Sequence, residues 1–201
     1  MRVIAGKYGG RPLRAITGTE IRPTSDRLRE TLFNVLTAGN PDALVGTVWM
    51  DLYAGTGAVG IEALSRGAKQ VLFVENSARA VKVIGRNLSS LEIADSYRIL
   101  SDELSAIFWR LEKEHFTADV VFLDPPYAKR EAYEETLTAL AESSVVWAMS
   151  LVIAEHEKKF DLGSDFGSLR RVRKLVQGDS AVSFYRIGGQ PDLNAKRISE
   201  G

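Results

Sequence analysis

The chain has 201 residues, of which 45% are hydrophobic and 26% charged, and its 26 basic and 26 acidic side chains leave no formal net charge. This composition is typical of a globular protein of one domain, and the neutral charge argues against a protein that coats nucleic acid by bulk electrostatic attraction. The chain has no cysteine and only two histidines, so we expect neither disulfides nor a metal site. No apolar stretch approaches the roughly 18 residues of a membrane span. Residues 1–7 lack the apolar core of a signal peptide, and we therefore expect a cytoplasmic protein.

The first thirty residues carry the clearest local excess of basic charge, with seven basic and three acidic side chains. Residues 2–5 and 11–16 are predicted to pair as a hairpin, because Gly9-Gly10 supplies a turn that tolerates positive φ. The segment 22–26 then predicts the start of a helix, with Thr24, Ser25 or Asp26 as the N-cap. Apolar residues recur at helical spacing after it and give this helix one apolar face: Leu28, Leu32, Val35 and Leu36.

From Val48 onward, strand-like and helix-like segments alternate along the chain. The expected strands are 48–52, 70–75, 97–100, 119–123 and 149–154. The expected helices between them are 58–66, 77–89, 103–114 and 131–143. Repeated β-α units of this length predict an α/β fold of the Rossmann-like kind, with a parallel sheet and helices on both of its faces. We expect Trp49, Trp109 and Trp147 in the core of this fold.

The end of the chain changes its pattern. Residues 169–176 and 180–187 are adjacent strand-like runs, so an antiparallel hairpin is predicted to complete the sheet. Basic residues cluster on the first of these runs, and we interpret the cluster as a solvated face: Arg170, Arg171, Arg173 and Lys174. Residues 1–187 are expected to form a single domain, followed by a flexible tail of residues 188–201.

A glycine loop follows the first strand, where Gly55, Gly57 and Gly60 match the spacing G-x-G-x-x-G. This spacing alone fits a nicotinamide cofactor as readily as any other. Asp51 decides between the readings, because a carboxylate beside the loop would repel a pyrophosphate but attract the sulfonium and ammonium groups of S-adenosylmethionine. Asp51 could also accept hydrogen bonds from the amides of the loop. The loop therefore favours S-adenosylmethionine as the cofactor.

The ends of the next two strands supply further candidate cofactor ligands. Glu75 is placed to accept hydrogen bonds from both ribose hydroxyls. Asp102, just past the third strand, is placed to bond the adenine amino group. Tyr53 and Asn76 lie next to these positions and complete the candidate cofactor site.

A second motif, Asp124-Pro125-Pro126-Tyr127, directly follows the apolar run 120–123. Two prolines fix φ and remove two backbone donors, so the chain leaves the sheet in a stiff extended turn. A planar base fits such a turn: Tyr127 can stack on its face, while Asp124 and the carbonyl of Pro125 accept hydrogen bonds from an exocyclic amino group. An ordinary strand-ending turn is the alternative, because Asp and Pro are common turn residues.

The order of the two motifs, residues 51–57 and then 121–127, resembles the class I S-adenosylmethionine-dependent methyltransferases that modify exocyclic amino groups. Residues 2–6, 22–34 and 60–68 narrow the similarity to the RsmD family of 16S ribosomal RNA guanine-N2 methyltransferases, over residues 2–187. This resemblance implies a seven-stranded, mostly parallel sheet whose last strand is antiparallel. It also implies that Thr24 reaches the methionine carboxylate of the cofactor.

The resemblance further implies that the hairpin of residues 1–20 and the helix after it approach the RNA. Five basic residues are the candidate RNA contacts: Arg2, Lys7, Arg11, Arg14 and Arg22. The expected partner is 16S ribosomal RNA or an assembling small ribosomal subunit, bound by a monomer without metal or membrane.

Three other functions stay open at this point. Adenine-N6 methylation of DNA or RNA would use the same D-P-P-Y chemistry, although a chain of this length leaves no separate domain for recognising DNA. A nicotinamide oxidoreductase is disfavoured by Asp51. A non-catalytic RNA-binding module is disfavoured because both halves of the candidate active site are intact.

Overall fold

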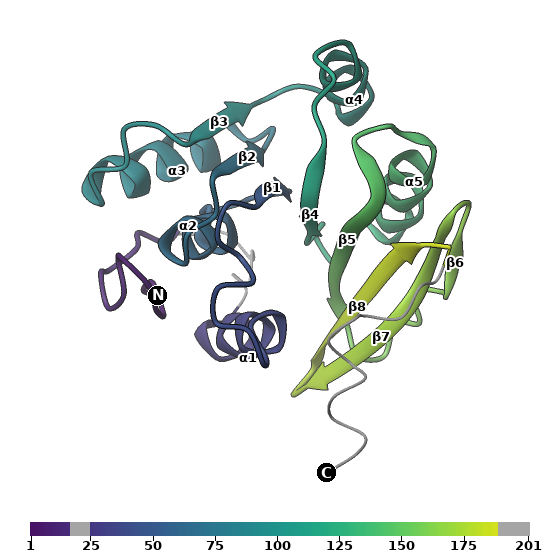
Figure 1. The fold of residues 1–201 in the computed structure, drawn as a ribbon, viewed down its shortest axis with the longest axis horizontal. Coiled ribbons are helices and arrows are strands. Elements are labelled where there is room, and N and C mark those ends of the chain that lie inside the picture. Colours follow the sequence, from purple (N-terminus) through teal and green to yellow (C-terminus); the bar gives the residue numbers. More distant parts are fainter. Residues whose placement is uncertain (17–24, 189–201) are drawn as a thin grey trace.

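A mixed eight-stranded sheet runs through the part of the chain that this computed structural model describes, residues 1–16 and 25–188 (Figure 1). Its strands are β1 (Val48–Leu52), β2 (Gln70–Val74), β3 (Tyr97–Leu100), β4 (Ala118–Leu123), β5 (Val146–Glu157), β6 (Asp165–Phe166), β7 (Leu169–Gln177) and β8 (Ser180–Ile187). The helices are α1 (Asp26–Leu36), α2 (Ala58–Ser65), α3 (Ala78–Ser90), α4 (Leu104–Lys113) and α5 (Arg130–Glu142). None of these helices is long and apolar enough to cross a membrane.

The strand order is β3-β2-β1-β4-β5-β8-β7-β6. Strands β1 to β5 are parallel to one another, and β8 enters antiparallel between β5 and β7. This arrangement confirms the predicted α/β fold with an antiparallel last strand. The sheet has eight strands instead of the expected seven, because the two-residue strand β6 pairs with the outer edge of β7. Sequence patterns could not indicate β6, since two residues carry no alternation.

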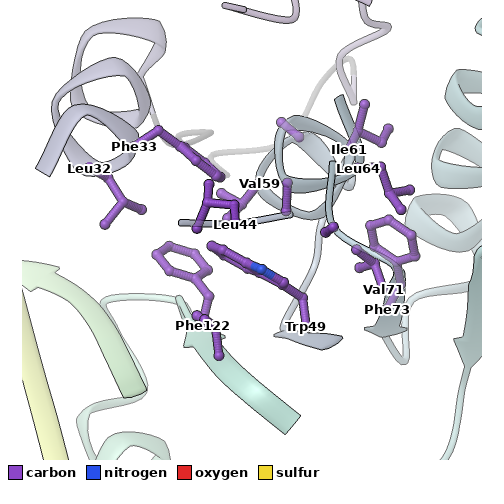
Figure 2. Close-up of a cluster of buried hydrophobic side chains, with 14 of the residues drawn as sticks. Leu32, Phe33, Leu44, Trp49, Val59, Ile61, Leu64, Val71, Phe73 and Phe122 are labelled. Carbon is purple, nitrogen blue, oxygen red and sulfur yellow. The ribbon is translucent and has the colours of Figure 1, made fainter. Parts of the chain in front are cut away.

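Helices cover both faces of the sheet (Figure 1). The face toward α1, α2 and α3 packs around Trp49, whose ring stacks on Phe33 of α1 with centroids 5.5 Å apart (Figure 2). The opposite face packs residues of β1 and β4 against α4 and α5, with Leu111 and Leu137 fully buried. Trp49 is thus in the core as predicted, whereas the prediction was wrong for Trp109 and Trp147. Trp109 is 65% exposed because α4 turns it outward, and Trp147 is 42% exposed in the irregular stretch between Val146 and Leu151, where the register of β5 against β4 shifts.

The N-terminal segment folds back on itself less regularly than a hairpin. Only Arg2 and Pro12 form a β-bridge, although Val3 N–H donates to the Arg11 carbonyl at 2.9 Å and Gly10 N–H donates to the Val3 carbonyl at 2.9 Å. Two full strands do not form in residues 1–16, because the amides of Ile4 and Ala5 turn toward α2 instead of toward the opposite arm. The helix after this segment begins as predicted, with Ser25 Oγ accepting from Leu28 N–H at 3.1 Å.

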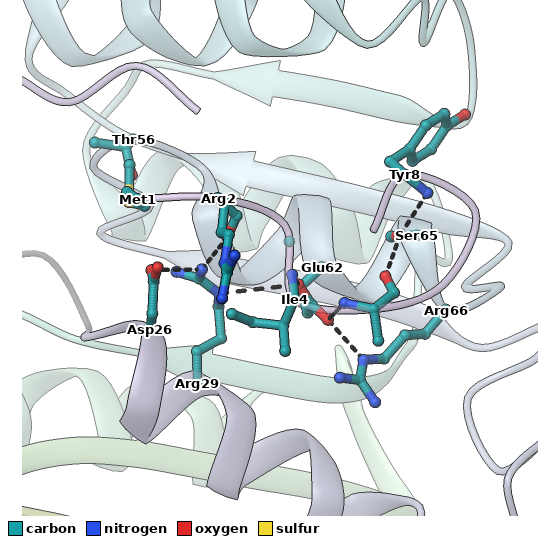
Figure 3. Close-up of polar contacts among 12 residues, drawn as sticks. Met1, Arg2, Ile4, Tyr8, Asp26, Arg29, Thr56, Glu62, Ser65 and Arg66 are labelled. Carbon is teal, nitrogen blue, oxygen red and sulfur yellow. Dashed lines mark hydrogen bonds and ion pairs between the residues drawn. The ribbon is translucent and has the colours of Figure 1, made fainter. Parts of the chain in front are cut away.

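A buried polar network fixes the N-terminal segment to α1 and α2 (Figure 3). Glu62 of α2 is fully buried, and its carboxylate accepts hydrogen bonds from Ile4 N–H at 2.7 Å and Ala5 N–H at 3.1 Å. The same carboxylate pairs with Arg66 at 2.7 Å and lies 3.9 Å from Nε of the fully buried Arg29. Arg29 also donates to the Arg2 carbonyl, so one arginine of α1 connects three parts of the chain.

Candidate active site

The residues of the two sequence motifs meet at one edge of the sheet. Leu52 of β1 pairs with Val74 of β2 on one side and with Leu123 of β4 on the other. Because parallel strands end at the same edge, the residues that follow these three strands are neighbours. The glycine loop, Glu75 and the Asp124-Pro125-Pro126-Tyr127 turn therefore lie side by side.

Asp51 lies beneath the glycine loop, 2% exposed, and its Oδ2 accepts a hydrogen bond from Gly60 N–H at 2.9 Å. Burial raises the pKa of this carboxyl to about 8; the Gly60 hydrogen bond lowers it, and the nearby charge of Glu75 raises it further. Asp51 therefore accepts a hydrogen bond from an amide of the glycine motif, as the sequence allowed. A cation bound above the loop would favour the ionised form of this group.

Two glycines of the loop meet different steric demands. Gly57 is the N-cap of α2 and has a φ of 76°, a conformation that an L side chain rarely adopts. Gly60 lies against the ring of Phe73, where an added Cβ would come within 2.4 Å of a ring carbon. Both glycines let the loop turn tightly and α2 pack closely on β2.

Glu75 and Tyr53 hold the other side of the loop. Glu75 accepts from Gly55 N–H with one carboxylate oxygen and from Ser77 N–H with the other, each at 2.8 Å. Tyr53 adopts a positive φ of 58°, which costs a non-glycine residue about 1–3 kcal/mol. Its hydroxyl is 2.7 Å from Thr136 Oγ1 of α5, and this contact fixes the ring beside the loop.

A pocket of about 440 Å³ opens beside these residues. It brings together four predicted cofactor ligands, which are Tyr53, Glu75, Asn76 and Asp102. Asp102 is half-exposed there and pairs with Arg110 at 2.9 Å, so its carboxylate has a protein partner besides the expected adenine. Asp51, Gly55 and Gly57 do not line this pocket, and Asp51 is buried below the loop. Thr24 lies outside the described residues.

The Asp124-Pro125-Pro126-Tyr127 turn follows β4 and is tied to three other elements. The carbonyl of Pro125 accepts a hydrogen bond from the Tyr133 hydroxyl of α5 at 3.2 Å. The Tyr127 hydroxyl is 3.4 Å from Glu155 Oε1 of β5 and 3.2 Å from Ser180 Oγ of β8. Burial raises the pKa of both tyrosines, and the negative charges of Glu155 and Asp124 add to this effect. Both hydroxyls therefore stay protonated at neutral pH.

Sequence reasoning missed the residues that support this turn and Thr136, which supports Tyr53 beside the glycine loop. Tyr133 and Thr136 carry no signal of their own, since they look like ordinary positions of an amphipathic helix. Glu155 does carry one, because it is an acid in the apolar run 151–155 of a central strand, where unpaired acids are rarely buried.

Four of the candidate RNA contacts belong to the described N-terminal segment, and none of these four lines the pocket. Arg2, Lys7, Arg11 and Arg14 are all exposed. The Arg11 guanidinium donates to the Ser90 carbonyl at 2.6 Å, and Lys7 Nζ lies 5.2 Å from the centre of the Tyr8 ring. Arg14 is held through its backbone, whose N–H donates to Asn87 Oδ1 at 2.8 Å. Arg22 lies outside the described residues.

Known proteins are similar in sequence to this chain along nearly its whole length. Residues 1–186 match the family model described as conserved hypothetical protein 95. YlbH of Bacillus subtilis is 33% identical over 189 residues, which cover 94% of this chain and 100% of YlbH. Ribosomal RNA small subunit methyltransferase D of Escherichia coli is 30% identical over 195 residues, which cover 97% of this chain and 94% of that protein.

The chain belongs to the family described as conserved hypothetical protein 95. The resemblance to the RsmD family is thereby confirmed. The solved structure of yhhF from Escherichia coli has the same fold, with a TM-score of 0.77 and 31% identity across 94% of this chain and 99% of that one. The family extends over the glycine loop, the proline turn and the described N-terminal segment alike.

Proposed function

We propose that the chain is an S-adenosylmethionine-dependent methyltransferase that modifies the exocyclic N2 amino group of a guanine in 16S ribosomal RNA. The observation that carries the proposal is the meeting of the cofactor-type loop and the Asp124-Pro125-Pro126-Tyr127 turn at one sheet edge. Its relative in Escherichia coli, named a ribosomal RNA small subunit methyltransferase, supports the substrate class.

The residues of the pocket fit S-adenosylmethionine by their chemistry. This cofactor would supply a methyl group carried on a positively charged sulfur. A nitrogen nucleophile can bond to the methyl carbon while the carbon–sulfur bond breaks. Glu75 offers carboxylate lone pairs beyond those used by Gly55 and Ser77, which suits a ribose diol. The buried carboxyl of Asp51 gains its charge most easily when a cation lies near it, and that preference suits a sulfonium or ammonium group.

The proline turn would hold and orient the guanine. Asp124 and the Pro125 carbonyl would accept hydrogen bonds from the amino group, shift electron density onto its nitrogen and aim the lone pair toward the cofactor. Because Tyr133 occupies only one lone pair of the Pro125 carbonyl, the second can accept from the base. Tyr127 would stack on the base, a contact worth about 1–3 kcal/mol. Once the nitrogen is methylated, its surplus proton would leave to Asp124 or water.

Methyl transfer from tritiated S-adenosylmethionine tests this function. Small ribosomal subunits and 16S RNA from cells that lack the family member should incorporate label, and digestion should give N2-methylguanosine. Duplex DNA offered at the same concentration should stay unlabelled. Label in N6-methyladenosine would contradict the assigned base. Reduction of a nicotinamide cofactor without methyl transfer would contradict the whole proposal.

We also propose that the N-terminal segment grips RNA phosphates, with Arg2, Lys7, Arg11, Arg14 and Arg22 as contacts. The four of these residues that are described are exposed on a segment anchored to α2 and α3. A rigid support makes such a grip specific in shape as well as charge. The proposed enzyme acts as a monomer in the cytoplasm, where its ribosomal substrate is assembled. Thr24 and Asn76 remain proposed cofactor ligands.

A further inference from the structure

The hydroxyl of Tyr127 lies where three elements meet. Tyr127 belongs to the turn after β4, and its hydroxyl is 3.4 Å from Glu155 Oε1 on β5 and 3.2 Å from Ser180 Oγ at the start of β8. Residues 124–127 themselves form neither helix nor strand. The two prolines restrain the backbone end of the tyrosine, and the two polar partners restrain its far end.

Glu155 is an unusual residue for its position. Its side chain is 4% exposed in the middle of the sheet, opposite Val182 of β8. Ser180 stands two residues before Val182, so it projects from the same face of the sheet as Glu155. Burying a carboxyl group in a sheet costs several kcal/mol unless polar partners compensate it. The Tyr127 hydroxyl is one such partner, and it comes from the turn that is proposed to hold the base.

We propose that Glu155 and Ser180 are positioning residues that fix the ring of Tyr127 for stacking on the target base. This inference rests on the proposed function. A phenylalanine could stack equally well by area, but its ring would swing about the Cα–Cβ bond. Anchoring the hydroxyl holds the ring in one orientation before the base arrives, so that less conformational entropy is lost on binding.

The charge of the surroundings agrees with this role. The Tyr127 phenol has a raised pKa, first through burial and then through the negative charge of Glu155, and stays a hydrogen-bond donor at neutral pH. A protonated phenol can donate to Glu155 while accepting from Ser180. Glu157, two residues further along β5, pairs with Arg130 instead at 3.5 Å. It therefore offers a matched control on the same face of the same strand.

A double-mutant cycle on methyl transfer tests the inference. Tyr127→Phe and Glu155→Ala should each lower kcat/KM for small subunits about 5- to 20-fold, as expected for loss of one ordinary hydrogen bond. Tyr127→Phe combined with Glu155→Ala should be no worse than the poorer single variant, because both remove the same contact. Glu155→Gln, which keeps an acceptor oxygen, should recover most of the loss, and Glu157→Ala should behave as wild type.

A second variant, at Ser180, distinguishes a folding defect from a positioning defect. Ser180→Ala removes only a hydroxyl, and it should lower kcat/KM in the wild-type background but not beside Tyr127→Phe. The affinity for S-adenosylmethionine should stay unchanged in every variant. Additive losses in both cycles would overturn the inference, since the residues would then act independently of the Tyr127 hydroxyl.

A readout without catalysis keeps this inference distinct from the proposed function. 3-Fluorotyrosine placed at position 127 should shift its ¹⁹F resonance and titrate at lower pH when Glu155 is replaced by Ala, because a neighbouring negative charge is lost. If the wild-type protein transfers no methyl group to ribosomal RNA, but Glu155→Ala still shifts the resonance, the proposed function is refuted and the anchoring of Tyr127 is supported. If the wild-type protein is active and Glu155→Ala leaves the resonance where it was, only the positioning role is refuted.

Discussion

Asp51 lies next to the last residue of β1 and Asp124 directly follows the neighbouring strand β4, yet their surroundings give the two carboxyls different chemistry. Asp51 is buried under the glycine loop, and burial raises its pKa to about 8. Asp124 is half-buried in a turn whose prolines leave carbonyls without competing backbone donors. One acid is therefore suited to sense a cation within the protein, and the other to accept hydrogen bonds from a base.

Replacing Asp124 by Ala should lower kcat for methyl transfer by about 100-fold or more, because the acceptor that polarises the amino group is lost in the transition state. Affinity for S-adenosylmethionine, measured by calorimetry, should not change. Asp124→Asn should be less damaged, since an amide oxygen still accepts one hydrogen bond. Normal turnover by the alanine variant would remove the assigned role of this turn.

Binding of S-adenosylmethionine near pH 7 should release about one proton, because the cation lowers the pKa of Asp51 from about 8 and ionises it. Calorimetry in buffers of different ionisation enthalpy measures this release directly. Asp51→Asn should abolish it, whereas Asp102→Asn, which alters an exposed pocket residue, should leave it intact. Equal proton release by the Asp51 variant would show that another group titrates.

The same carboxyl sets the direction of a pH effect on folding. The unfolded chain ionises Asp51 near its ordinary value of 3.8, while the folded protein keeps it protonated up to about pH 8. In that interval the folded state binds more protons, so stability falls as pH rises from about 4 to about 8. Chemical denaturation of the cofactor-free protein should show this slope, and Asp51→Asn should flatten it.

At the level of elements, the N-terminal segment serves as a clamp on the glycine-loop helix. Glu62 of α2 receives the amides of Ile4 and Ala5, and Arg29 of α1 lies beside the same carboxylate. The clamp therefore joins α1, α2 and residues 1–5 through one buried acid.

Glu62→Ala should destabilise the protein by about 3–5 kcal/mol, because it leaves the fully buried Arg29 without its acidic neighbour on α2 and two amides without an acceptor. Urea denaturation measures this change. Arg66→Ala removes a more exposed partner of the same carboxylate and should cost much less. Similar losses in both variants would mean that the network is not centred on Glu62.

The elements were largely predictable from sequence, while the network was not. Alternating apolar runs located β1 to β5 and their helices, and Ser25 was among the predicted caps of α1. The glycine spacing and the acids at strand ends predicted a shared edge, because topology alone brings those ends together. Contacts between distant side chains, such as Tyr133 with Pro125 or Glu62 with Ile4, leave no local periodicity in the sequence. The hairpin predicted for residues 2–5 and 11–16 is therefore reduced to one antiparallel bridge, because the amides of Ile4 and Ala5 bond Glu62.

For the whole molecule, zero net charge makes the placement of basic residues decisive for binding RNA. Four exposed basic residues sit on the clamped N-terminal segment. The strand β7 carries others: Arg170 pairs with Asp165 at 2.9 Å and Arg171 with Asp161 at 3.2 Å, while Arg173 and Lys174 are exposed. The resemblance to the RsmD family favours the N-terminal segment of these two surfaces for a phosphate grip.

Arg14→Glu should raise KM for small ribosomal subunits and flatten the salt dependence of binding, since fewer counterions are released when a phosphate contact is lost. This variant keeps the backbone hydrogen bonds between residue 14 and Asn87, so folding should survive. Arg170→Glu on β7 is the matched control and should leave KM unaltered. Unchanged kinetics for Arg14→Glu would leave the N-terminal charges as a solvated surface.

The clamp also has a consequence for how the chain is made. Residues 1–5 leave the ribosome well before residue 62, whose carboxylate receives the amides of Ile4 and Ala5, and Arg14 leaves it before residue 87, on which it docks. Residues 1–14 must therefore wait, undocked, until α1, α2 and most of α3 have been synthesised. Its buried Val3 is exposed throughout that interval. Substitutions that weaken the clamp should accordingly lower the yield of protein translated in cells more than the recovery of purified chain refolded from urea.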